Sequence, residues 1–271
     1  MNALSEAERD HTLAIATDVA REAAELALEG WRSGTSIRKK GTIDLLTEYD
    51  LKTEALIRER LSAAFPEHRI VGEEGEVREG SAEFTWYVDP IDGTTNFAHG
   101  HPFFCVSIAL WAEGAGAGHG EIAVVSAPAL GVTWNARRGG GAFRNGERCH
   151  TSGTRELKDA LGATGFPYDR WDSTEDNLRE HRAFLKRTRG IRRCGSAAID
   201  LCLVAEGTYD LYWEQKLAPW DMCAGAILVI EAGGTLSDYD GGAAEPRAGR
   251  LVATNGPLHD ATLALLHDAR T

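Results

Sequence analysis

The sequence predicts a layered α and β protein made of two halves, and three patterns support this. Helical periodicity occupies the first part of the chain, strand patterns separated by glycine-rich turns follow, and helix and strand patterns then alternate to the end. Successive strands are typical of an antiparallel sheet, whereas alternation is typical of an α/β arrangement. With 271 residues, 43% of them hydrophobic, the chain can build a sizeable core. We place the boundary near Thr151-Ser152-Gly153-Thr154, which gives expected domains 1–153 and 154–271.

The first half opens with two predicted helices. Ser5-Glu6-Ala7-Glu8 has the form of a capping box, and apolar residues then recur at helical spacing, so we expect a helix of about 24 residues that ends at Gly30. A second helix is expected from Leu51 to Phe65, because Pro66 cannot continue it. Strands are predicted after it at 69–72, 84–89, 104–111, 121–126, 132–135 and 142–144.

The second half alternates between the two kinds of element. Helices are predicted near 176–187, at 196–206, in the segment that starts at Asp221 and from Pro257 onward. Strands are predicted at 190–192, 209–213 and 251–253. This order indicates the α/β arrangement of the C-terminal half.

Composition excludes several classes of function. The net charge of −12 argues against nucleic acid or an anionic membrane as a partner, because both attract a basic surface. The first ten residues lack the basic and apolar regions of a secretory signal, and the longest apolar run, Phe103 to Ala112, is too short to span a bilayer. Five cysteines without a Cys-x-x-Cys pair fit neither a disulfide framework nor a zinc ribbon. We therefore expect a cytoplasmic protein.

The segment Trp86 to Phe97 carries the most informative chemistry. An apolar run ends there on Asp89 and Asp92, and Gly93-Thr94-Thr95 follows at once. Carboxylate oxygens are ligands that Mg²⁺ prefers, and the N–H groups of a helix that opens after Asp92 would face a phosphate. By itself, an Asp-x-x-Asp-Gly sequence is more often an ordinary turn.

Two further acidic segments change that balance. Glu73 lies in Arg69 to Gly75 after a β-branched run, and Asp221 lies in Pro219 to Ala226 at the start of an apolar segment. Each alone reads as a surface acid or a helix cap. Together, Glu73, Asp89, Asp92 and Asp221 resemble the inositol monophosphatase family, whose Gly-Glu-Glu, Asp-Pro-Ile-Asp-Gly-Thr-Thr-Asn-Phe and Trp-Asp-x-x-Ala-Gly motifs occur here in order and at similar spacing.

The resemblance runs from about Lys39 to Gly234. Weaker markers are the segment from Asp44 to Asp50, the hairpin Gly141 to Gly146, the loop Arg192 to Ala198 and the acid Glu214. The residues Gln215 to Pro219 look like those of the bacterial and plastid members rather than the animal ones, so the resemblance does not carry over fine specificity.

The resemblance implies a five-layer αβαβα sandwich with its site between the halves, and Mg²⁺-dependent hydrolysis of a phosphate monoester. Two cations about 4 Å apart hold the attacking water and the leaving oxygen in such chemistry. By motif, the first metal takes Glu73, Asp89 and the carbonyl of Ile91, and the second takes Asp89, Asp92 and Asp221. A weaker third magnesium lies near Glu73 in the family. Thr94, hydrogen-bonded to Asp44, is implied to orient the water.

Substrate contacts follow from the same resemblance. The N–H groups of Gly93 and Thr94 would bind the phosphate, and the alcohol part would meet Gly195, Ser196, Ala197 and Glu214. A carboxylate such as Glu214 suits a polyol because it accepts hydrogen bonds from hydroxyls. Inhibition by Li⁺ and a homodimer are also implied.

Three functions stay open at this point. They are hydrolysis of myo-inositol 1-phosphate, the same chemistry on histidinol phosphate or fructose 1,6-bisphosphate, and a non-catalytic, metal-binding regulatory role. Glu214 and the Asp-Gly-Thr-Thr form favour the first, and the intact set of acidic residues argues against the third. His99 and His101 are expected to be solvated loop residues, and Cys105, Cys202 and Cys223 core residues.

Overall fold

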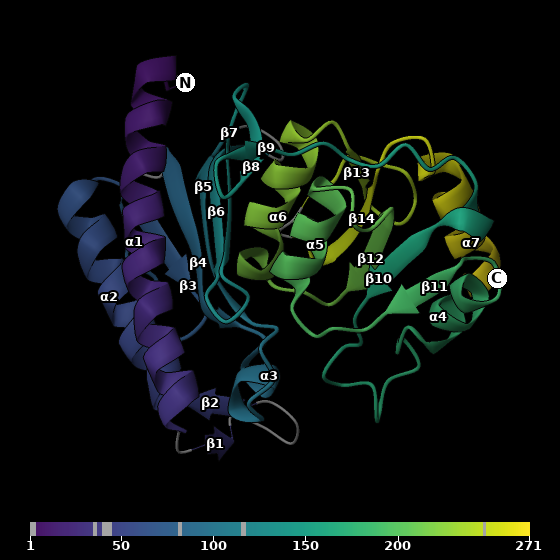
Figure 1. Ribbon diagram of the computed structural model, residues 1–271, viewed down its shortest axis with the longest axis horizontal. Coiled ribbons are helices and arrows are strands. Elements are labelled where there is room, and N and C mark those ends of the chain that lie inside the picture. The colour runs from purple at the N-terminus through teal and green to yellow at the C-terminus, as the bar shows by residue number, and fades with distance from the viewer. Residues whose placement is uncertain (1–3, 35–36, 40–44, 81–82, 115–117, 246–247) are drawn as a thin grey trace.

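The protein folds into five stacked layers of helices and sheets. The computed structural model describes residues 4–34, 37–39, 45–80, 83–114, 118–245 and 248–271. Helices α1 (Glu6–Ser33) and α2 (Glu48–Ala64) form the first layer, and a seven-stranded sheet forms the second (Figure 1). Helices α5 (Ala197–Ala205) and α6 (Pro219–Glu231) lie between this sheet and a five-stranded one. Helices α4 (Leu178–Leu185) and α7 (His259–Arg270) cover its far face, so the expected αβαβα sandwich is confirmed.

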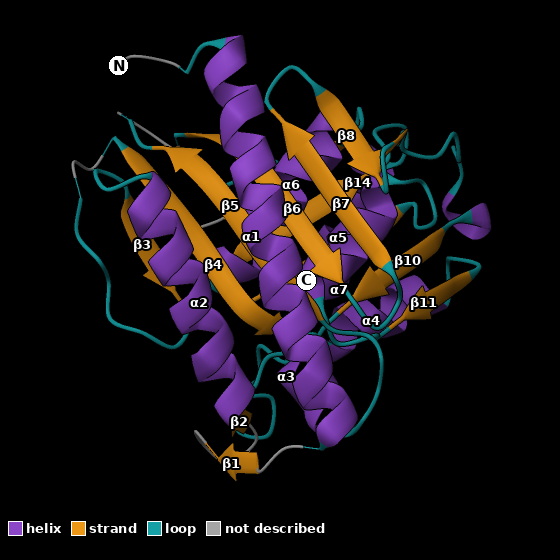
Figure 2. Cartoon of the chain, turned by 60° about the vertical axis from the view of Figure 1, so that its left-hand side comes forward, coloured by secondary structure: helices purple, strands orange, loops and turns teal. Residues whose placement is uncertain are grey.

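The seven-stranded sheet follows chain order. Its strands are β3 (Arg69–Gly72), β4 (Phe84–Asp92), β5 (Cys105–Ala112), β6 (His119–Ala127), β7 (Val132–Arg137), β8 (Gly141–Arg144) and β9 (Glu147–Arg148). Neighbours pair antiparallel as predicted, except that β3 and β4 are parallel. Helices cover both faces of this sheet (Figure 2). Every residue of β4 and β5 is buried for that reason, and both strands read as near-continuous apolar runs.

The five-stranded sheet has the order β11 (Gly190–Arg192), β10 (Leu161–Thr164), β12 (Leu211–Gln215), β14 (Arg250–Thr254) and β13 (Thr235–Ser237). Strand β10 is parallel to β11 and β12, whereas β14 is antiparallel to β12 and β13. The sequence patterns missed β10 and β13 because both are short. They also missed the small pair of β1 (Ile37–Lys39) and β2 (Leu45–Thr47) and a 3₁₀ turn at Leu157–Asp159. The helix expected to open after Asp92 is α3 (Thr94–Ala98).

The first helix begins as predicted and ends later. The hydroxyl of Ser5 accepts from the N–H of Glu8 at 3.3 Å, and the Glu8 carboxylate accepts from the N–H of Ser5 at 2.7 Å, which confirms the capping box. The helix continues past Gly30 to Ser33, so the predicted stop is wrong. A Cβ at Gly30 would lie 2.4 Å from the Tyr49 ring. Glycine is required there because α1 and α2 approach closely.

Helices α5 and α6 join the two sheets. Residues 222–229 of α6 are all buried, and a Cβ at Gly225 would lie 2.4 Å from Leu201 of α5. Both helices contact strands of both sheets.

The predicted boundary near residue 153 falls between the last strand of the first sheet and the first strand of the second, and it stays a prediction. Among the described residues, the helices are too short or too polar to cross a bilayer.

Candidate active site

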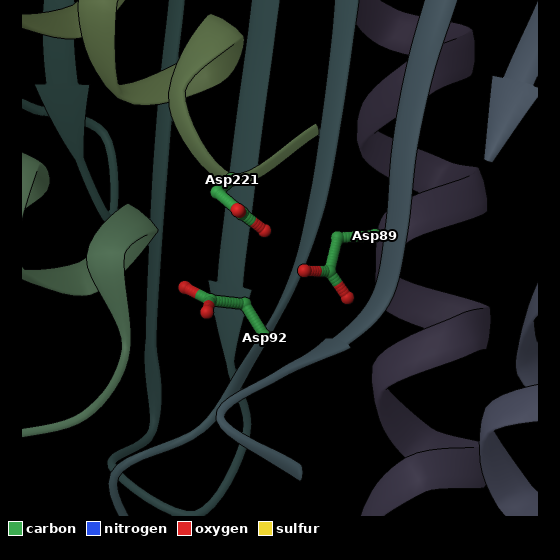
Figure 3. A group of neighbouring side chains, drawn as sticks. All are labelled: Asp89, Asp92 and Asp221. Atoms are coloured by element: carbon green, nitrogen blue, oxygen red, sulfur yellow. The ribbon is translucent and has the colours of Figure 1, made fainter. Parts of the chain in front are cut away.

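Three aspartates converge where the two halves meet. Asp89 and Asp92 lie at the end of β4, and Asp221 lies in the first turn of α6. Each offers one carboxylate oxygen, and these oxygens lie within 4.8 Å of one another (Figure 3). Side chains three positions apart point to opposite faces of a regular strand. The register of β4 against β5 shifts between Asp89 and Asp92, and this irregularity allows both carboxylates to reach the same space.

Asp92 is held from the other half of the molecule. Its Oδ2 accepts from the hydroxyl of Ser196 at 2.6 Å and from the N–H of Ala198 at 2.7 Å, both at the start of α5. The thiol of Cys105 lies 3.9 Å from the same oxygen. These contacts fix the carboxylate and tie the end of β4 to the N-terminus of α5.

The other two aspartates are oriented by backbone groups close in the chain. Asp89 Oδ1 accepts from the N–H of Ile91 at 2.9 Å, and Asp221 Oδ2 accepts from the N–H of Ala218 at 2.7 Å. Asp221 therefore caps α6, as its sequence position suggested. Each of the three carboxylates keeps a defined orientation before any cation is added.

Burial raises the pKa of all three carboxyl groups. For Asp89 the pKa lies well above its usual value because of burial first and then the charges of Glu73, Asp92 and Asp221. Burial, with the charge of Asp92 next, also places the pKa of Asp221 well above its usual value. Burial raises the pKa of Asp92 to about 6, against the opposing hydrogen bonds from Ser196 and Ala198. A cation between these groups would remove their mutual repulsion, and such perturbed clusters in clefts mark functional sites.

Glu73 lies in the loop after β3 and is half-buried. It lines the same pocket as Asp89 but lies outside the three-oxygen cluster. The buried Glu54 of α2 holds this loop, since its carboxylate accepts from the N–H groups of Glu74 at 2.7 Å and Gly75 at 2.8 Å. Arg58 donates to the same carboxylate at 2.6 Å. The position of Glu73 thus depends on a carboxyl group that the sequence motifs did not reveal.

Thr94 begins α3 and shares its hydroxyl proton between two acceptors. These are the carbonyl of Ile91 at 3.1 Å and Asp50 Oδ1 at 3.4 Å. Asp44, the predicted partner of Thr94, lies outside the described residues. In the described structure the carboxylate partner is Asp50, which also accepts from the N–H of Thr47 at 2.8 Å and caps α2. The capping-box pattern Thr-x-x-Asp was the sequence signal for this residue.

One pocket of about 210 Å³ joins the predicted site residues. Apart from Asp44, every one of them lines it, namely Glu73, Asp89, Ile91, Asp92, Gly93, Thr94, Gly195, Ser196, Ala197, Glu214 and Asp221. Sequence reasoning gave no individual site role to ten further lining residues, which are Thr164, Gly165, Phe166, Tyr168, Arg193, Asp200, Lys216, Leu217, Ala218 and Trp220. Four of them, Thr164, Gly165, Phe166 and Tyr168, belong to β10 and the loop after it, which carry no recognisable motif.

Glycines shape the part of this pocket next to Asp92. Gly93 has φ +98°, and a Cβ there would lie 3.0 Å from the carbonyl of Phe103 and 3.1 Å from that of Gly195. Asn96 donates from Nδ2 to the carbonyls of Phe103 at 2.7 Å and Cys194 at 2.8 Å. The turn after Asp92 and the loop before α5 are therefore packed backbone against backbone, which leaves no room for a side chain.

The same pocket contains Glu214 of β12. Its Oε2 accepts from the hydroxyl of Tyr212 at 2.6 Å. Burial raises the pKa of Glu214 to about 7, while the Tyr212 hydrogen bond and the Arg193 charge lower it.

His99 and His101 are exposed, and Cys105, Cys202 and Cys223 are buried, as expected.

Comparison with known proteins agrees with this geometry. Residues 8–271 match the model of the inositol monophosphatase family. The chain belongs to this family. It is 42% identical over 261 residues to a Nus factor SuhB from Pseudomonas aeruginosa, covering 94% of this chain and 95% of that protein. It is 40% identical to an inositol-1-monophosphatase from Synechocystis, covering 91% and 85%. An inositol monophosphatase structure from Anabaena superposes with a TM-score of 0.86 at 36% identity, covering 96% of each chain.

The inositol monophosphatase family acts on phosphate monoesters with a metal, and the residues present fit that chemistry. The donors at the cluster are oxygen atoms of carboxylates, the ligand type that Mg²⁺ prefers. They lie close enough for cations to bridge them, and burial makes the uncompensated charge costly. The resemblance seen in the sequence is confirmed at the level of family and fold.

Proposed function

We propose that this enzyme hydrolyses the phosphate monoester of a polyol, most specifically myo-inositol 1-phosphate, with Mg²⁺ as its cofactor. The observation that carries the proposal is that one pocket is lined both by the three-aspartate cluster and by Glu214. A phosphate at the cluster would bring its alcohol part to the buried carboxylate. Carboxylates accept hydrogen bonds from hydroxyls, and an apolar alcohol would leave Glu214 with the Tyr212 hydroxyl alone as donor.

Mg²⁺ would be held by Asp89, Asp92, Asp221, Glu73 and the carbonyl of Ile91. Bound divalent cations supply Lewis-acid polarisation of the phosphate and a water of lowered pKa. The chain's own contribution is to fix the carboxylates and exclude bulk water. Asp92 is held by Ser196 and Ala198, so two hydrogen bonds join the cluster to the start of α5.

Backbone and hydroxyl groups complete the proposed reaction site. The N–H groups of Gly93 and Thr94, at the start of α3, would bind the phosphate oxygens. Thr94 would orient the attacking water, since its hydroxyl is itself placed by Ile91 and Asp50. Gly195, Ser196, Ala197 and Glu214 would bind the alcohol part.

Two alternative functions are open: the first keeps the hydrolysis and changes the substrate, and the second involves no catalysis. Histidinol phosphate and fructose 1,6-bisphosphate would use the same cluster with a different alcohol part. A regulatory role would match the name Nus factor that the Pseudomonas aeruginosa and Vibrio cholerae relatives carry. The complete acidic set supports catalysis over a role that needs no turnover.

Phosphate release across a panel of substrates tests the proposal. The panel contains myo-inositol 1-phosphate, histidinol phosphate, fructose 1,6-bisphosphate, β-glycerophosphate and p-nitrophenyl phosphate, each with and without Mg²⁺. We expect Mg²⁺-dependent release with the highest kcat/KM on myo-inositol 1-phosphate, and inhibition by Li⁺ at millimolar concentration. Equal kcat/KM on p-nitrophenyl phosphate would refute the polyol assignment, and release without a divalent cation would refute the metal assignment.

A further inference from the structure

Tyr212 is a buried polar residue that the proposed reaction does not use. It lies on β12 two positions before Glu214, and its side chain is fully buried. It does not line the pocket, yet its hydroxyl donates to Glu214 Oε2 at 2.6 Å. A buried hydroxyl directed at a carboxylate forms a charge-assisted bond that is short and strong. The bond therefore determines where the carboxylate of Glu214 lies.

A second contact restricts the same carboxylate. In the part of the chain that the structure describes, Tyr212 is the one hydrogen-bond partner of Glu214. Gly165, in the loop after β10, packs against the same carboxylate, since a Cβ there would be 1.9 Å from Glu214 Oε1 and 2.2 Å from both Oε2 and Cδ. The carboxylate is therefore held by the Tyr212 hydroxyl and fits against the bare Cα of Gly165, and among the described residues no group donates to Oε1.

We propose that Tyr212 is a positioning residue that sets the preference for polyol phosphates, because it holds Glu214 with Oε1 ready to accept from substrate hydroxyls. This inference rests on the proposed function and deepens it. Without the Tyr212 hydroxyl, the carboxylate would lose its orientation, and one oxygen would be left buried without a partner. Both changes weaken binding of hydroxyl groups and leave the phosphate end of the site in place.

The pH dependence of the substrate preference reports on the charge of Glu214. It would not change if Tyr212 served only to stabilise the fold. Burial raises its pKa to about 7, the Tyr212 hydrogen bond and the Arg193 guanidinium lower it, and Asp92 raises it further. Asp200 on α5, Asp221 on α6 and the hydroxyl of Tyr239 also interact with Glu214. Loss of the Tyr212 hydrogen bond should raise the pKa of Glu214. The preference for polyol phosphates would then require a higher pH.

The experiment compares Tyr212→Phe with a matched control, Tyr87→Phe. Tyr87 is also buried, and its hydroxyl also donates to a carboxylate, Glu113 Oε1 at 3.1 Å, outside the pocket. The measured quantity is the ratio of kcat/KM on myo-inositol 1-phosphate to that on p-nitrophenyl phosphate, from pH 6 to 9. Tyr212→Phe should lower the ratio at pH 7 about 10-fold, the size of one hydrogen bond to a charged group. The pH midpoint of the ratio should move upward, and Tyr87→Phe should change neither quantity.

Two further variants make the test decisive. Gly165→Ala should lower the ratio by displacing Glu214 while the Tyr212 hydroxyl stays intact, and it carries the test if Tyr212→Phe fails to fold. In a Glu214→Gln background, Tyr212→Phe should cause no further loss of the ratio. A wild-type preference that survives both Tyr212→Phe and Gly165→Ala, or equal losses on both substrates, would overturn this inference alone. A wild-type enzyme that shows no polyol preference would overturn the proposed function together with the inference.

Discussion

The three-aspartate cluster and Glu214 line the same pocket but differ in their surroundings. We call them the metal end and the alcohol end of the pocket, after their proposed roles. At the metal end, three carboxylate oxygens from β4 and α6 lie within 4.8 Å of one another, and burial together with the charges of neighbouring carboxylates raises the pKa of Asp89 and Asp221. At the alcohol end, burial raises the pKa of Glu214 to about 7, although its hydrogen bond from Tyr212 lowers it. A cation would relieve the repulsion at the metal end, whereas Glu214 already has one hydrogen-bond donor. In the proposed function, the metal end reacts and the alcohol end selects the substrate.

Loss of one aspartate at the metal end should give the largest effect. Asp92→Asn keeps an oxygen that can accept from Ser196 and Ala198, so the fold should persist while the ligand charge is lost. We expect kcat to fall by more than about 100-fold, beyond the 10–100-fold typical of a lost outer partner. The matched control is Asp210→Asn, which alters a buried aspartate that accepts from Ser152 and Leu161 away from the pocket. Near-normal Mg²⁺-dependent turnover in Asp92→Asn would remove the metal assignment.

The loop that carries Glu73 offers an intermediate effect. Glu54→Gln replaces one acceptor oxygen with an amide that cannot accept, so the N–H of Glu74 or Gly75 loses its partner. We expect Mn²⁺, used as a probe in calorimetry, to bind about 10-fold more weakly, as for other partners of metal ligands. Glu22→Gln, which breaks an exposed pair with Arg60 on the outer helices, should not change this affinity. Equal affinity in both variants would show that the Glu73 loop does not depend on Glu54.

How much of this site the sequence predicts depends on the end considered. The metal end was predicted residue by residue from the resemblance of three local motifs to those of the inositol monophosphatase family, since each motif by itself is equally typical of a turn, a surface acid or a helix cap. Asp50 was not predicted as a partner of Thr94, although its capping box with Thr47 is visible in the sequence. The predicted contact of Thr94 with Asp44 stays a prediction. Residues such as Gly165 and Asp200 were missed for a different reason. Their role comes from β10 and α5 packing around Glu214, a tertiary arrangement that short strands without motifs do not reveal.

The same distinction holds for the fold. Long helices and the buried strands of the first sheet were predicted, because their periodicity and length are informative. The short strands of the second sheet were missed in part, and Gly30 was misread as a helix stop. A glycine in a helical pattern can mark either an end or a close contact, and only the position of Tyr49 decides between them.

At the alcohol end, Glu214→Gln should separate substrate classes. A glutamine is a weaker acceptor and lacks the charge, so we expect a loss of about 1–3 kcal/mol in transition-state binding of myo-inositol 1-phosphate. Hydrolysis of p-nitrophenyl phosphate, which has no such hydroxyls, should change much less. The measurement is kcat/KM on both substrates at pH 8, above the pKa of about 7 for Glu214. Equal losses on the two substrates would place Glu214 in support of the metal end or the fold, and the contrast between the ends would fail.

The smallest expected effect concerns stability and pH. The pKa of Asp92 in the folded protein is about 6, above the ~3.9 of an unfolded aspartate, so the folded state binds more protons between these values. The metal-free protein therefore loses stability as pH rises through this window, and Mg²⁺ should restore it by binding the ionised carboxylates, for which protons compete at lower pH. At about 100 times its Kd, Mg²⁺ should stabilise by about 2.7 kcal/mol, or roughly 5–10 °C in Tm. Thermal unfolding at pH 8 should show this shift, and at pH 5 the shift should largely disappear. In Asp92→Asn the dependence on pH should weaken, because one of the competing proton sites is gone. A Mg²⁺ shift that is equal at both pH values in the wild type would mean that the cation binds away from the three aspartates.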